Sequence, residues 1–250
     1  MQLNDQVAIV TGAGQGMGRG IAEKLARCGA AVAVADKEEQ NARETVRAIE
    51  QAGGRAVAVT SDVGNTDDIG RMFDVCQAEL GTPDILVANA GISRPCPITQ
   101  VPEEFFRSIY EVNTKGTLFC LKEAGLRLKD GGRIVVISSC SARYPEMGMA
   151  VYGSSKAAVQ LMVEVAALEF APRGITVNSI QPGLTATPTM LRFASQEHIQ
   201  KAIDSTPLGR LGAPEDIAEV AAFLCSRESQ WITGQHILAN GGCMPGYERV

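Results

Sequence analysis

The segment Val7-Ala-Ile-Val-Thr-Gly-Ala-Gly-Gln-Gly-Met-Gly18 joins a short apolar run to a turn rich in glycine. Its first four residues are all apolar, which is typical of a strand buried on both faces of a sheet. The residues from Gly18 to Cys28 have a helical pattern, and Gly29 follows in the usual capping position. A strand, a glycine turn and a helix in this order predict the first unit of an α/β protein with a parallel sheet.

The glycines of this turn fit the spacing GxxxGxG in two registers. One register uses Gly12, Gly16 and Gly18, and the other uses Gly14, Gly18 and Gly20. We prefer the first, because its first glycine directly follows the strand. Glycines let a pyrophosphate approach the backbone, and the free N–H groups and dipole of the next helix attract the anion. The turn therefore predicts a nucleotide site, with a merely flexible loop as the alternative.

Apolar runs and helical patterns alternate along the rest of the chain. Further strands are predicted at 31–35, 56–60, 84–88, 133–137, 176–180 and 235–238. Helices are predicted at 38–52, at 66–80 with Thr66 as the cap, at 102–129 with a bend near Asn113, and at 214–225. A further helix is predicted after the strand at 133–137; it contains Tyr152 and Lys156 and ends near residue 171. This order predicts one domain over residues 1–250, a doubly wound, Rossmann-like parallel sheet with helices on both faces. Residues 183–212 show no regular pattern, and we expect a long substrate loop there.

Composition limits what the chain can do. Of its 250 residues, 45% are hydrophobic and 20% are charged, which fits an ordinary soluble domain. The net charge of −5 argues against a general nucleic-acid or membrane surface, and no apolar run is long enough to span a bilayer. No secretory signal pattern is visible. The seven cysteines form no CxxC pair and only two histidines are present, so we expect no metal site and predict reduced thiols in a cytoplasmic protein.

Asp36 ends the second predicted strand, 18 residues beyond Gly18. In a dinucleotide-binding fold, a carboxylate at this place accepts hydrogen bonds from the hydroxyls of the adenosine ribose. It would repel the 2′-phosphate of NADP, so NAD is the predicted cofactor. Gln15 also favours NAD, because it stands where an arginine could have met a phosphate, whereas Lys37 keeps NADP open. A solvated carboxylate at a strand end is the alternative.

Tyr152 and Lys156 lie four residues apart in Ala150-Val-Tyr-Gly-Ser-Ser-Lys-Ala-Ala-Val159. On a helix they would share one face. A cation beside a phenol favours the phenolate and lowers the tyrosine pKa from its usual value near 10. The pair therefore predicts a group that transfers protons near neutral pH. Two side chains on a solvated helix face are the alternative.

Together these features resemble the short-chain dehydrogenase/reductase family, over essentially the whole chain. The matches are in sequence order. They are Thr11 to Gly18 for TGxxxGxG, Asp62-Val63 for the adenine-contacting pair, Asn89-Ala90-Gly91 for the NAG element, Asn113 in Val-Asn-Thr-Lys-Gly, Ser139 at 13 residues before Tyr152, Pro182-Gly183 followed by Thr187, and Pro-Leu-Gly-Arg-Leu-Gly-Ala-Pro-Glu-Asp-Ile-Ala from Pro207. The stretch Asn240-Gly-Gly departs mildly from the usual Asp-Gly-Gly.

The resemblance implies four catalytic residues. Tyr152 would be the general acid and base at the substrate oxygen, and Ser139 would hydrogen-bond that oxygen. Lys156 would lower the Tyr152 pKa and hold the nicotinamide ribose, and Asn113 would anchor a water that links Lys156 to solvent. The implied cofactor-binding residues are Gly12, Gln15, Gly16, Met17, Gly18, Asp36, Asp62, Val63, Asn89, Ala90, Gly91, Tyr152, Lys156, Pro182, Gly183, Leu184, Thr185 and Thr187.

The predicted activity is hydride transfer between NAD(H) and a secondary alcohol or ketone. The alternatives are an NADPH-dependent 3-oxoacyl-acyl carrier protein reductase, whose pattern looks similar, and a catalytically silent nucleotide-binding protein of the same fold. Met147, Met149 and Met190 predict an adaptable, partly apolar substrate wall. Roles for Arg94, Arg143 and Cys140 near the pocket stay open. The resemblance also implies a homo-oligomer, usually a tetramer, and apolar stretches such as Val159 to Leu168 could pack between subunits.

Overall fold

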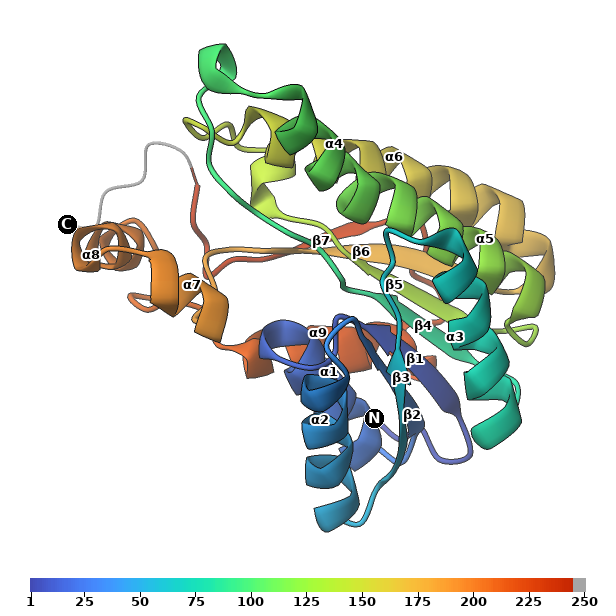
Figure 1. The fold of residues 1–250 in the computed structure, drawn as a ribbon. Coiled ribbons are helices and arrows are strands. Elements are labelled where there is room, and N and C mark those ends of the chain that lie inside the picture. The colour runs from blue at the N-terminus through green and yellow to red at the C-terminus, as the bar shows by residue number, and fades with distance from the viewer. Residues whose placement is uncertain (245–250) are drawn as a thin grey trace.

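The computed structural model describes residues 1–244 and all their side chains except that of Phe193. Within these residues, seven parallel strands form one sheet in the order β3-β2-β1-β4-β5-β6-β7 (Figure 1). The strands are β1 (Val7–Thr11), β2 (Ala31–Asp36), β3 (Arg55–Thr60), β4 (Ile85–Ala88), β5 (Arg133–Ile137), β6 (Thr176–Pro182) and β7 (His236–Ala239). The helices are α1 (Gly16–Arg27), α2 (Glu39–Gln51), α3 (Thr66–Glu79), α4 (Glu103–Tyr110), α5 (Thr117–Arg127), α6 (Ala150–Phe170), α7 (Pro188–Phe193), α8 (Gln196–Asp204) and α9 (Pro214–Cys225). Short helical turns lie at Ile98–Gln100, Cys140–Ala142, Ala171–Arg173 and Arg227–Ser229, and a π-helical turn spans Glu111–Gly116.

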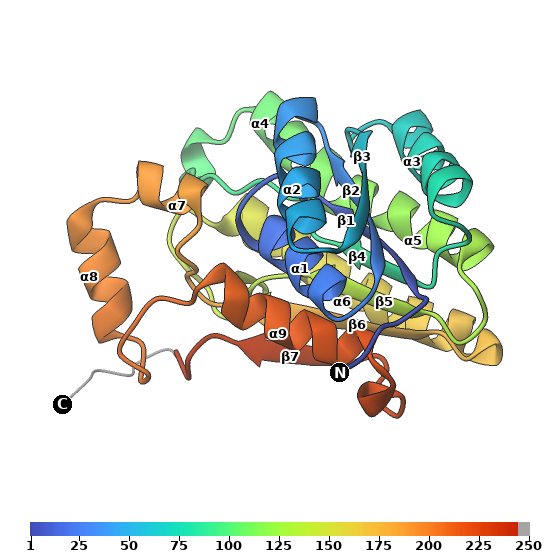
Figure 2. The same ribbon diagram turned by 90° about the horizontal axis from the view of Figure 1, so that it is seen from below.

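Helices cover both faces of the sheet, as predicted. α3, α5 and α6 pack on one face through residues such as Phe73 and Val163, while α1, α2 and α9 pack on the other through residues such as Ile21 and Ile217 (Figures 1 and 2). Strands β1 and β4 are buried at every position, which explains their continuous apolar sequences. The doubly wound fold is therefore confirmed. A single domain over residues 1–250 stays a prediction, because residues 245–250 lie outside the described part.

The order of the strands reverses between β1 and β4. β1 pairs with β2 on one side and with β4 on the other. In open parallel sheets, ligands bind beyond the carboxyl ends of the strands at this point. Asn89 spans it, because its side-chain amide donates hydrogen bonds to the carbonyl oxygens of Thr11 at 2.8 Å and Gly12 at 3.1 Å. The loops that follow β1 and β4 are thus held together.

The prediction that residues 183–212 form an irregular loop is wrong, because this segment contains helices α7 and α8. Thr187 caps α7 by accepting a hydrogen bond from the Met190 N–H, and Ser195 caps α8 by accepting one from the His198 N–H. Pro188 stands at the first position of α7, where its missing N–H has no cost. The two helices project beyond the sheet (Figures 1 and 2). The ends of the segment meet in a parallel bridge between Thr185 and Gly212.

The other predicted elements agree with the structure to within two residues at each end. The helix predicted at 102–129 is α4 and α5 joined by the π-helical turn, so the regular α-helix is interrupted at Asn113, where a bend was predicted. The cap predicted for α3 is wrong, because Asn65, one residue before Thr66, accepts the hydrogen bond from the Asp67 N–H. Among the described residues, no helix combines the length and the apolar character needed to cross a membrane.

Candidate active site

Helix α6 carries Tyr152 and Lys156 to the carboxyl end of β5. The Lys156 side chain is only 4% exposed, and its ammonium donates a 2.8 Å hydrogen bond to the Ile137 carbonyl oxygen. Val159, further along the same helix, lies fully buried in the core and anchors this face of α6 to the sheet. Burial disfavours the charged form and lowers the Lys156 pKa to about 8. The lysine can therefore gain and lose a proton close to neutral pH.

Tyr152 is half-buried at the start of the same helix. Burial raises its pKa, while a hydrogen bond with Ser139 acts in the opposite direction and lowers it. The predicted lowering of the Tyr152 pKa by Lys156 is wrong, because burial raises this pKa above its usual value. The Lys156 ammonium is directed to the Ile137 carbonyl, and Lys156 is not among the groups that lower the Tyr152 pKa. Ser139 instead favours the phenolate, and its hydroxyl oxygen also accepts a 3.1 Å hydrogen bond from the Ser141 N–H.

Asn113 is completely buried in the π-helical turn between α4 and α5. Its side-chain oxygen accepts a 2.8 Å hydrogen bond from the Ile92 N–H, and its amide donates to the Ile92 carbonyl at 2.9 Å and the Ser155 hydroxyl at 3.1 Å. A Cβ on Gly91 would lie 3.2 Å from the Lys156 nitrogen and 3.3 Å from the Asn113 side-chain oxygen. Gly91, Asn113 and Lys156 therefore converge, and π-bulges are frequent at such functional positions.

The backbone of the glycine turn has a left-handed conformation at two glycines of the preferred register. Gly12 and Gly16 have positive φ values of 61° and 56°, in the left-handed region that favours glycine. A Cβ on Gly18 would stand 2.1 Å from the Gly12 carbonyl oxygen, which no side chain tolerates. Gly14 and Gly20 are not among the positive-φ residues. Gly18 belongs to both registers, and a Cβ on Gly14 would also stand only 2.6 Å from the Asn41 Cβ. The positive φ values of Gly12 and Gly16 are therefore what favours their register.

The N-terminus of α1 is open to an anion. Gln15 at its cap makes no side-chain capping hydrogen bond, and no acidic residue lies in the first turn. The first N–H groups and the positive end of the helix dipole thus have no side-chain partner there. Gln15 is exposed, whereas Met17 is half-buried and packs against the core on the α1 face of the sheet.

Contacts join the glycine turn to the other predicted elements. A Cβ on Gly12 would lie 3.0 Å from the Ala90 Cα, next to the Gly91 that faces Lys156. A Cβ on Gly16 would lie 3.3 Å from the Thr187 Cβ, at the start of α7. The turn after β1, the loop after β4 and the segment after β6 therefore meet at one edge of the sheet.

The residues predicted to hold the adenosine half lie on the β2 and β3 side of this edge. The carboxylate of Asp36 accepts hydrogen bonds from the N–H of Gly14 at 2.8 Å and of Glu38 at 3.0 Å, so it also braces the glycine turn. Asp62 is exposed, and one of its carboxylate oxygens accepts a 2.8 Å hydrogen bond from the Gly64 N–H. Val63 beside it is buried.

The segment after β6 is held by backbone hydrogen bonds. A Cβ on Gly183, which follows Pro182, would stand 2.9 Å from the Asn240 Cα, so the chain passes closely there. The Gly212 N–H donates to the Leu184 carbonyl at 3.0 Å, and the Thr185 hydroxyl donates to the Gly183 carbonyl at 3.0 Å. These bonds fix the stretch that leads to Thr187.

The loops after β4 and β5 lie at the predicted pocket wall. A 2.8 Å hydrogen bond from the Cys96 N–H to the Gly148 carbonyl connects them. Met147 is 97% exposed, while Met149 and Met190 are half-buried. The Arg143 guanidinium lies 5.6 Å from the centre of the Tyr144 ring. Arg94 is exposed. Burial raises the Cys140 pKa, which keeps its thiol protonated.

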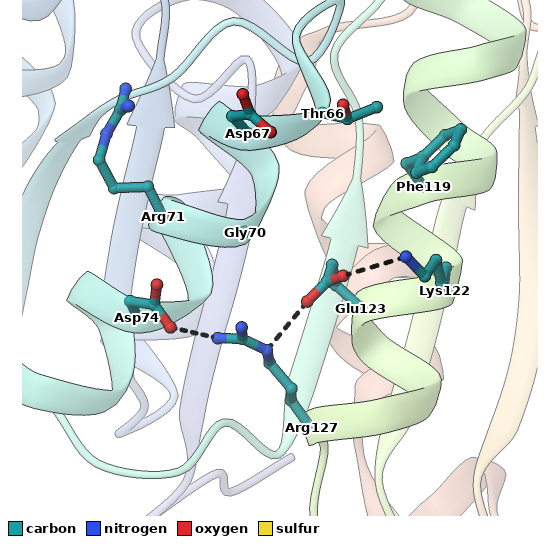
Figure 3. Close-up of a pocket in the computed structure, with 9 residues that line it drawn as sticks. All are labelled: Thr66, Asp67, Gly70, Arg71, Asp74, Phe119, Lys122, Glu123 and Arg127. Carbon is teal, nitrogen blue, oxygen red and sulfur yellow. Dashed lines mark hydrogen bonds and ion pairs between the residues drawn. The ribbon is translucent and has the colours of Figure 1, made fainter.

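A hollow of about 400 Å³ lies elsewhere, between α3 and α5 (Figure 3). One ion pair crosses it, because Arg127 on α5 contacts Asp74 on α3 at 2.6 Å, and Arg127 also contacts Glu123 on its own helix at 2.9 Å. None of the predicted site residues lines it. The converging residues, and not this hollow, therefore mark the candidate site.

Sequence reasoning missed two hydrogen-bonded groups outside the predicted site residues. The half-buried His236 bridges the buried hydroxyl of Ser179 and the carboxylate of Glu164. Arg210 forms two hydrogen bonds to Asp216 at 2.6 and 2.8 Å, close to the Gly212 bridge. The capping pattern Ala213-Pro-Glu-Asp216 was a visible signal for the second, whereas 57 and 72 residues separate His236 from its two partners.

Known proteins resemble the chain along nearly its full length. A family model described as enoyl-(acyl carrier protein) reductase matches residues 12–244. An uncharacterised oxidoreductase from Methylorubrum extorquens is 39% identical over 96% of this chain and 98% of its own. The 7α-hydroxysteroid dehydrogenase of Escherichia coli is 37% identical over 97% of this chain and 95% of its own.

A solved structure of a 7α-hydroxysteroid dehydrogenase complexed with NADH and 7-oxo glycochenodeoxycholic acid superposes with a TM-score of 0.94. It is 36% identical, and the match covers 97% of this chain and 96% of that one. A short-chain dehydrogenase/reductase from Serratia marcescens superposes with a TM-score of 0.92 at 32% identity, over 97% and 99% of the two chains. Fold, converging residues and relatives agree, and the chain belongs to the short-chain dehydrogenase/reductase family.

Proposed function

We propose that this protein is an oxidoreductase that transfers a hydride between NAD(H) and a secondary alcohol or ketone. The observation that carries the proposal is the convergence of Gly91, Asn113 and Lys156 beside the glycine turn, on the edge that α6 supplies with Tyr152. A relative of the same fold was solved with NADH and an oxo bile acid, which supports a nicotinamide cofactor and a carbonyl substrate.

The residues of this edge fit a dinucleotide. A Cβ at Gly12, Gly16 or Gly18 would press on Ala90, on Thr187 or on the Gly12 carbonyl, so this turn needs glycine to keep its shape. The α1 N-terminus offers its free N–H groups to a pyrophosphate. When bound, the nicotinamide supplies the carbon that accepts or gives the hydride. Asp36 would accept hydrogen bonds from the adenosine ribose, and Asp62 and Val63 would border the adenine. Asn89, Ala90, Gly91, Pro182, Gly183, Leu184, Thr185 and Thr187 would border the rest, with Lys156 at the second ribose.

Proton transfer is assigned to Tyr152. In ketone reduction its phenol donates a proton to the carbonyl oxygen of the substrate, while the Ser139 hydroxyl hydrogen-bonds the same oxygen. In alcohol oxidation the phenolate takes the hydroxyl proton. Lys156, whose pKa is about 8, can pass a proton toward solvent past the buried Asn113. Because burial raises the Tyr152 pKa, the phenol is protonated at neutral pH, which is the form that ketone reduction requires.

NAD is the proposed cofactor because the Asp36 carboxylate is fixed by two backbone N–H groups at the end of β2. A 2′-phosphate would meet this fixed charge. The second candidate is an NADPH-dependent 3-oxoacyl-acyl carrier protein reductase, because the matching family model is named for a reductase of carrier-protein substrates. Initial rates with NAD(H) and NADP(H), on a simple ketone and on an acetoacetyl thioester, separate the two candidates. Turnover of the thioester with NADPH alone would favour the second.

The substrate is proposed to have a partly apolar body. Met147, Leu191 and Ile98 are 97%, 52% and 76% exposed on the loops and helix that border the site. A panel of alcohols and ketones with NAD(H), followed at the nicotinamide absorbance, tests this proposal and the activity together. The panel includes ring ketones, short aliphatic ketones and sugar acids. The proposal fails if only highly charged sugar acids are turned over.

We further propose a cytoplasmic homo-oligomer, expected to be a tetramer. Leu118 and Leu126 on α5 and Leu161 and Leu168 on α6 are exposed by 46% to 78% and give these neighbouring helices an apolar outer surface. The seven cysteines are free thiols, as suits a reducing compartment. Light scattering at micromolar concentration tests the oligomer, and a mass near 26.5 kDa would contradict it.

A further inference from the structure

A chain of three hydrogen-bonded side chains joins helix α6 to the last two strands. The Ser179 hydroxyl on β6 lies 2.7 Å from Nδ1 of His236 on β7, and Nε2 of His236 lies 2.9 Å from a carboxylate oxygen of Glu164 on α6. Ser179 is completely buried, whereas Glu164 is 53% exposed at its side chain. None of the three belongs to the proposed catalytic or cofactor-binding set.

The donor roles in this chain follow from its chemistry. An ionised carboxylate only accepts hydrogen bonds, so Nε2 of His236 carries the proton and donates to Glu164. In a neutral imidazole the other ring nitrogen, Nδ1, is an acceptor, and the Ser179 hydroxyl donates to it. A neutral imidazole therefore satisfies both partners, including a hydroxyl that is costly to bury alone.

Serine, histidine and a carboxylate in this order are also the groups of hydrolase active sites. Here the serine cannot act as a nucleophile. Ser179 lies within β6, between β5 and β7, and is 0% exposed, so no substrate carbonyl can approach its oxygen. The three hydrogen-bonded side chains must therefore act by holding another element of the fold in place.

Strand β7 is the element that it holds. β7 is four residues long, is half-buried at every position and has β6 as its one neighbour within the described sheet. A short edge strand with little apolar burial opens easily. His236 is its first residue, and the bond to Glu164 fastens it to α6, the helix that bears Tyr152 and Lys156.

The far end of β7 supports the segment that leads into the site. The Gly183 N–H donates to the Ala239 carbonyl at 3.1 Å, and Asn240 packs directly against Gly183. The Leu208 N–H donates to the Gly241 carbonyl at 3.2 Å, and a Cβ on Gly241 would lie 2.7 Å from the Thr206 side chain. β7 and the residues directly after it therefore contact the segment that carries α7 and α8 at Gly183, before α7, and at Leu208, after α8.

We propose that the Glu164–His236–Ser179 chain positions the segment 183–208 by fixing β7 against α6. The consequence for activity rests on the proposed function, because Gly183 to Thr187 are there assigned to the nicotinamide half of the cofactor. The positioning itself does not depend on that assignment. His236, Glu164 and Ser179 are positioning residues, and none touches the reacting atoms.

Hydrogen exchange followed by mass spectrometry tests the positioning without any substrate. In His236→Ala and Glu164→Ala, peptides that cover 183–187, 206–208 and 236–243 should exchange about tenfold faster, while peptides of β1 and β2 stay unchanged. Glu164→Gln retains an acceptor oxygen and should restore protection. Asp130→Asn removes an exposed ion pair with Arg173 beyond α5 and should change none of these peptides. Unchanged exchange in both alanine variants, or an equal increase across the whole sheet, would overturn the proposal.

Steady-state kinetics then tests the consequence for activity. The alanine variants should raise KM for NAD roughly three- to tenfold with a smaller loss of kcat, and Glu164→Gln should recover the wild-type KM. A loss of kcat alone, without a change in KM, would contradict positioning of the cofactor segment. If the wild type shows no NAD-dependent turnover, the proposed function fails, and the exchange experiment still decides whether the chain positions the segment.

Discussion

The ammonium of Lys156 donates a 2.8 Å hydrogen bond to the carbonyl oxygen of Ile137, which ties α6 to the end of β5. This arrangement buries a lysine in the middle of the candidate site and lowers its pKa from 10.5 to about 8. A site residue of this kind costs stability, because water solvates the ammonium better than the protein does.

That cost depends on pH in a defined direction. Between pH 8 and 10.5 the unfolded chain binds a proton at Lys156 that the folded chain has released, so the free energy of unfolding rises with pH in this window. The difference of pKa corresponds to about 3 kcal/mol. Lys156→Met should be at least as stable as wild type at pH 7 and should lack this rise. Urea denaturation of both proteins from pH 7 to 10 measures the difference, and a difference independent of pH would contradict the assignment.

Gly18→Ala should abolish NAD binding and destabilise the fold by several kcal/mol. The new Cβ would stand 2.1 Å from the Gly12 carbonyl oxygen, so the turn must move. Gly70→Ala is the matched control, because Gly70 also lies in a helix and has nothing within 4 Å of its Cβ position. The control should gain about 0.5–1 kcal/mol from helix propensity. Calorimetry and NAD titration measure both variants, and normal NAD affinity in Gly18→Ala would refute the assigned role of the turn.

Asp36→Ala should reduce the preference for NAD over NADP by about tenfold or more, equivalent to about 1.4 kcal/mol. The substitution removes the charge that would repel a 2′-phosphate, and it also removes the acceptor that holds the Gly14 N–H. Affinity for NAD should therefore fall as well. The ratio of kcat/KM for the two cofactors is the measurement, and an unchanged ratio would show that Asp36 does not face the ribose.

Alcohol oxidation should become faster as pH rises from 7 to 9. Burial raises the Tyr152 pKa, so the phenolate that must accept the proton is scarce at neutral pH. Ketone reduction uses the protonated phenol and should be flat or falling over the same range. Profiles of kcat/KM in both directions provide the test, and oxidation that slows toward pH 9 in an intact protein would argue for another base.

Much of the fold could be predicted because local patterns determine it. The continuous apolar run of β1, the glycine turn and the repeated alternation leave few arrangements other than a doubly wound sheet. The helices α7 and α8 were missed although Thr187-Pro188 and Ser195 are ordinary start signals, because the helices are only 6 and 9 residues long and α8 buries no residue in the core.

The parts of the site that could not be predicted depend on contacts distant in the sequence. Spacing alone placed Tyr152 and Lys156 on one helical face, but it could not show that the lysine nitrogen meets the Ile137 carbonyl or that burial raises the tyrosine pKa. The bond between His236 and Glu164 spans 72 residues and leaves no local pattern. Protonation and long-range bonds require the packed structure.

The central claim is that the Tyr152 phenol transfers the proton, and Tyr152→Phe tests it most directly. The change removes one oxygen, so kcat should fall by about 10²–10⁴-fold while the dissociation constant of NAD stays close to that of wild type. Tyr110→Phe, which removes a hydroxyl bonded to Ser154 on the protein surface, should retain full activity. Near-wild-type turnover by Tyr152→Phe would contradict the account, whatever the cofactor affinity.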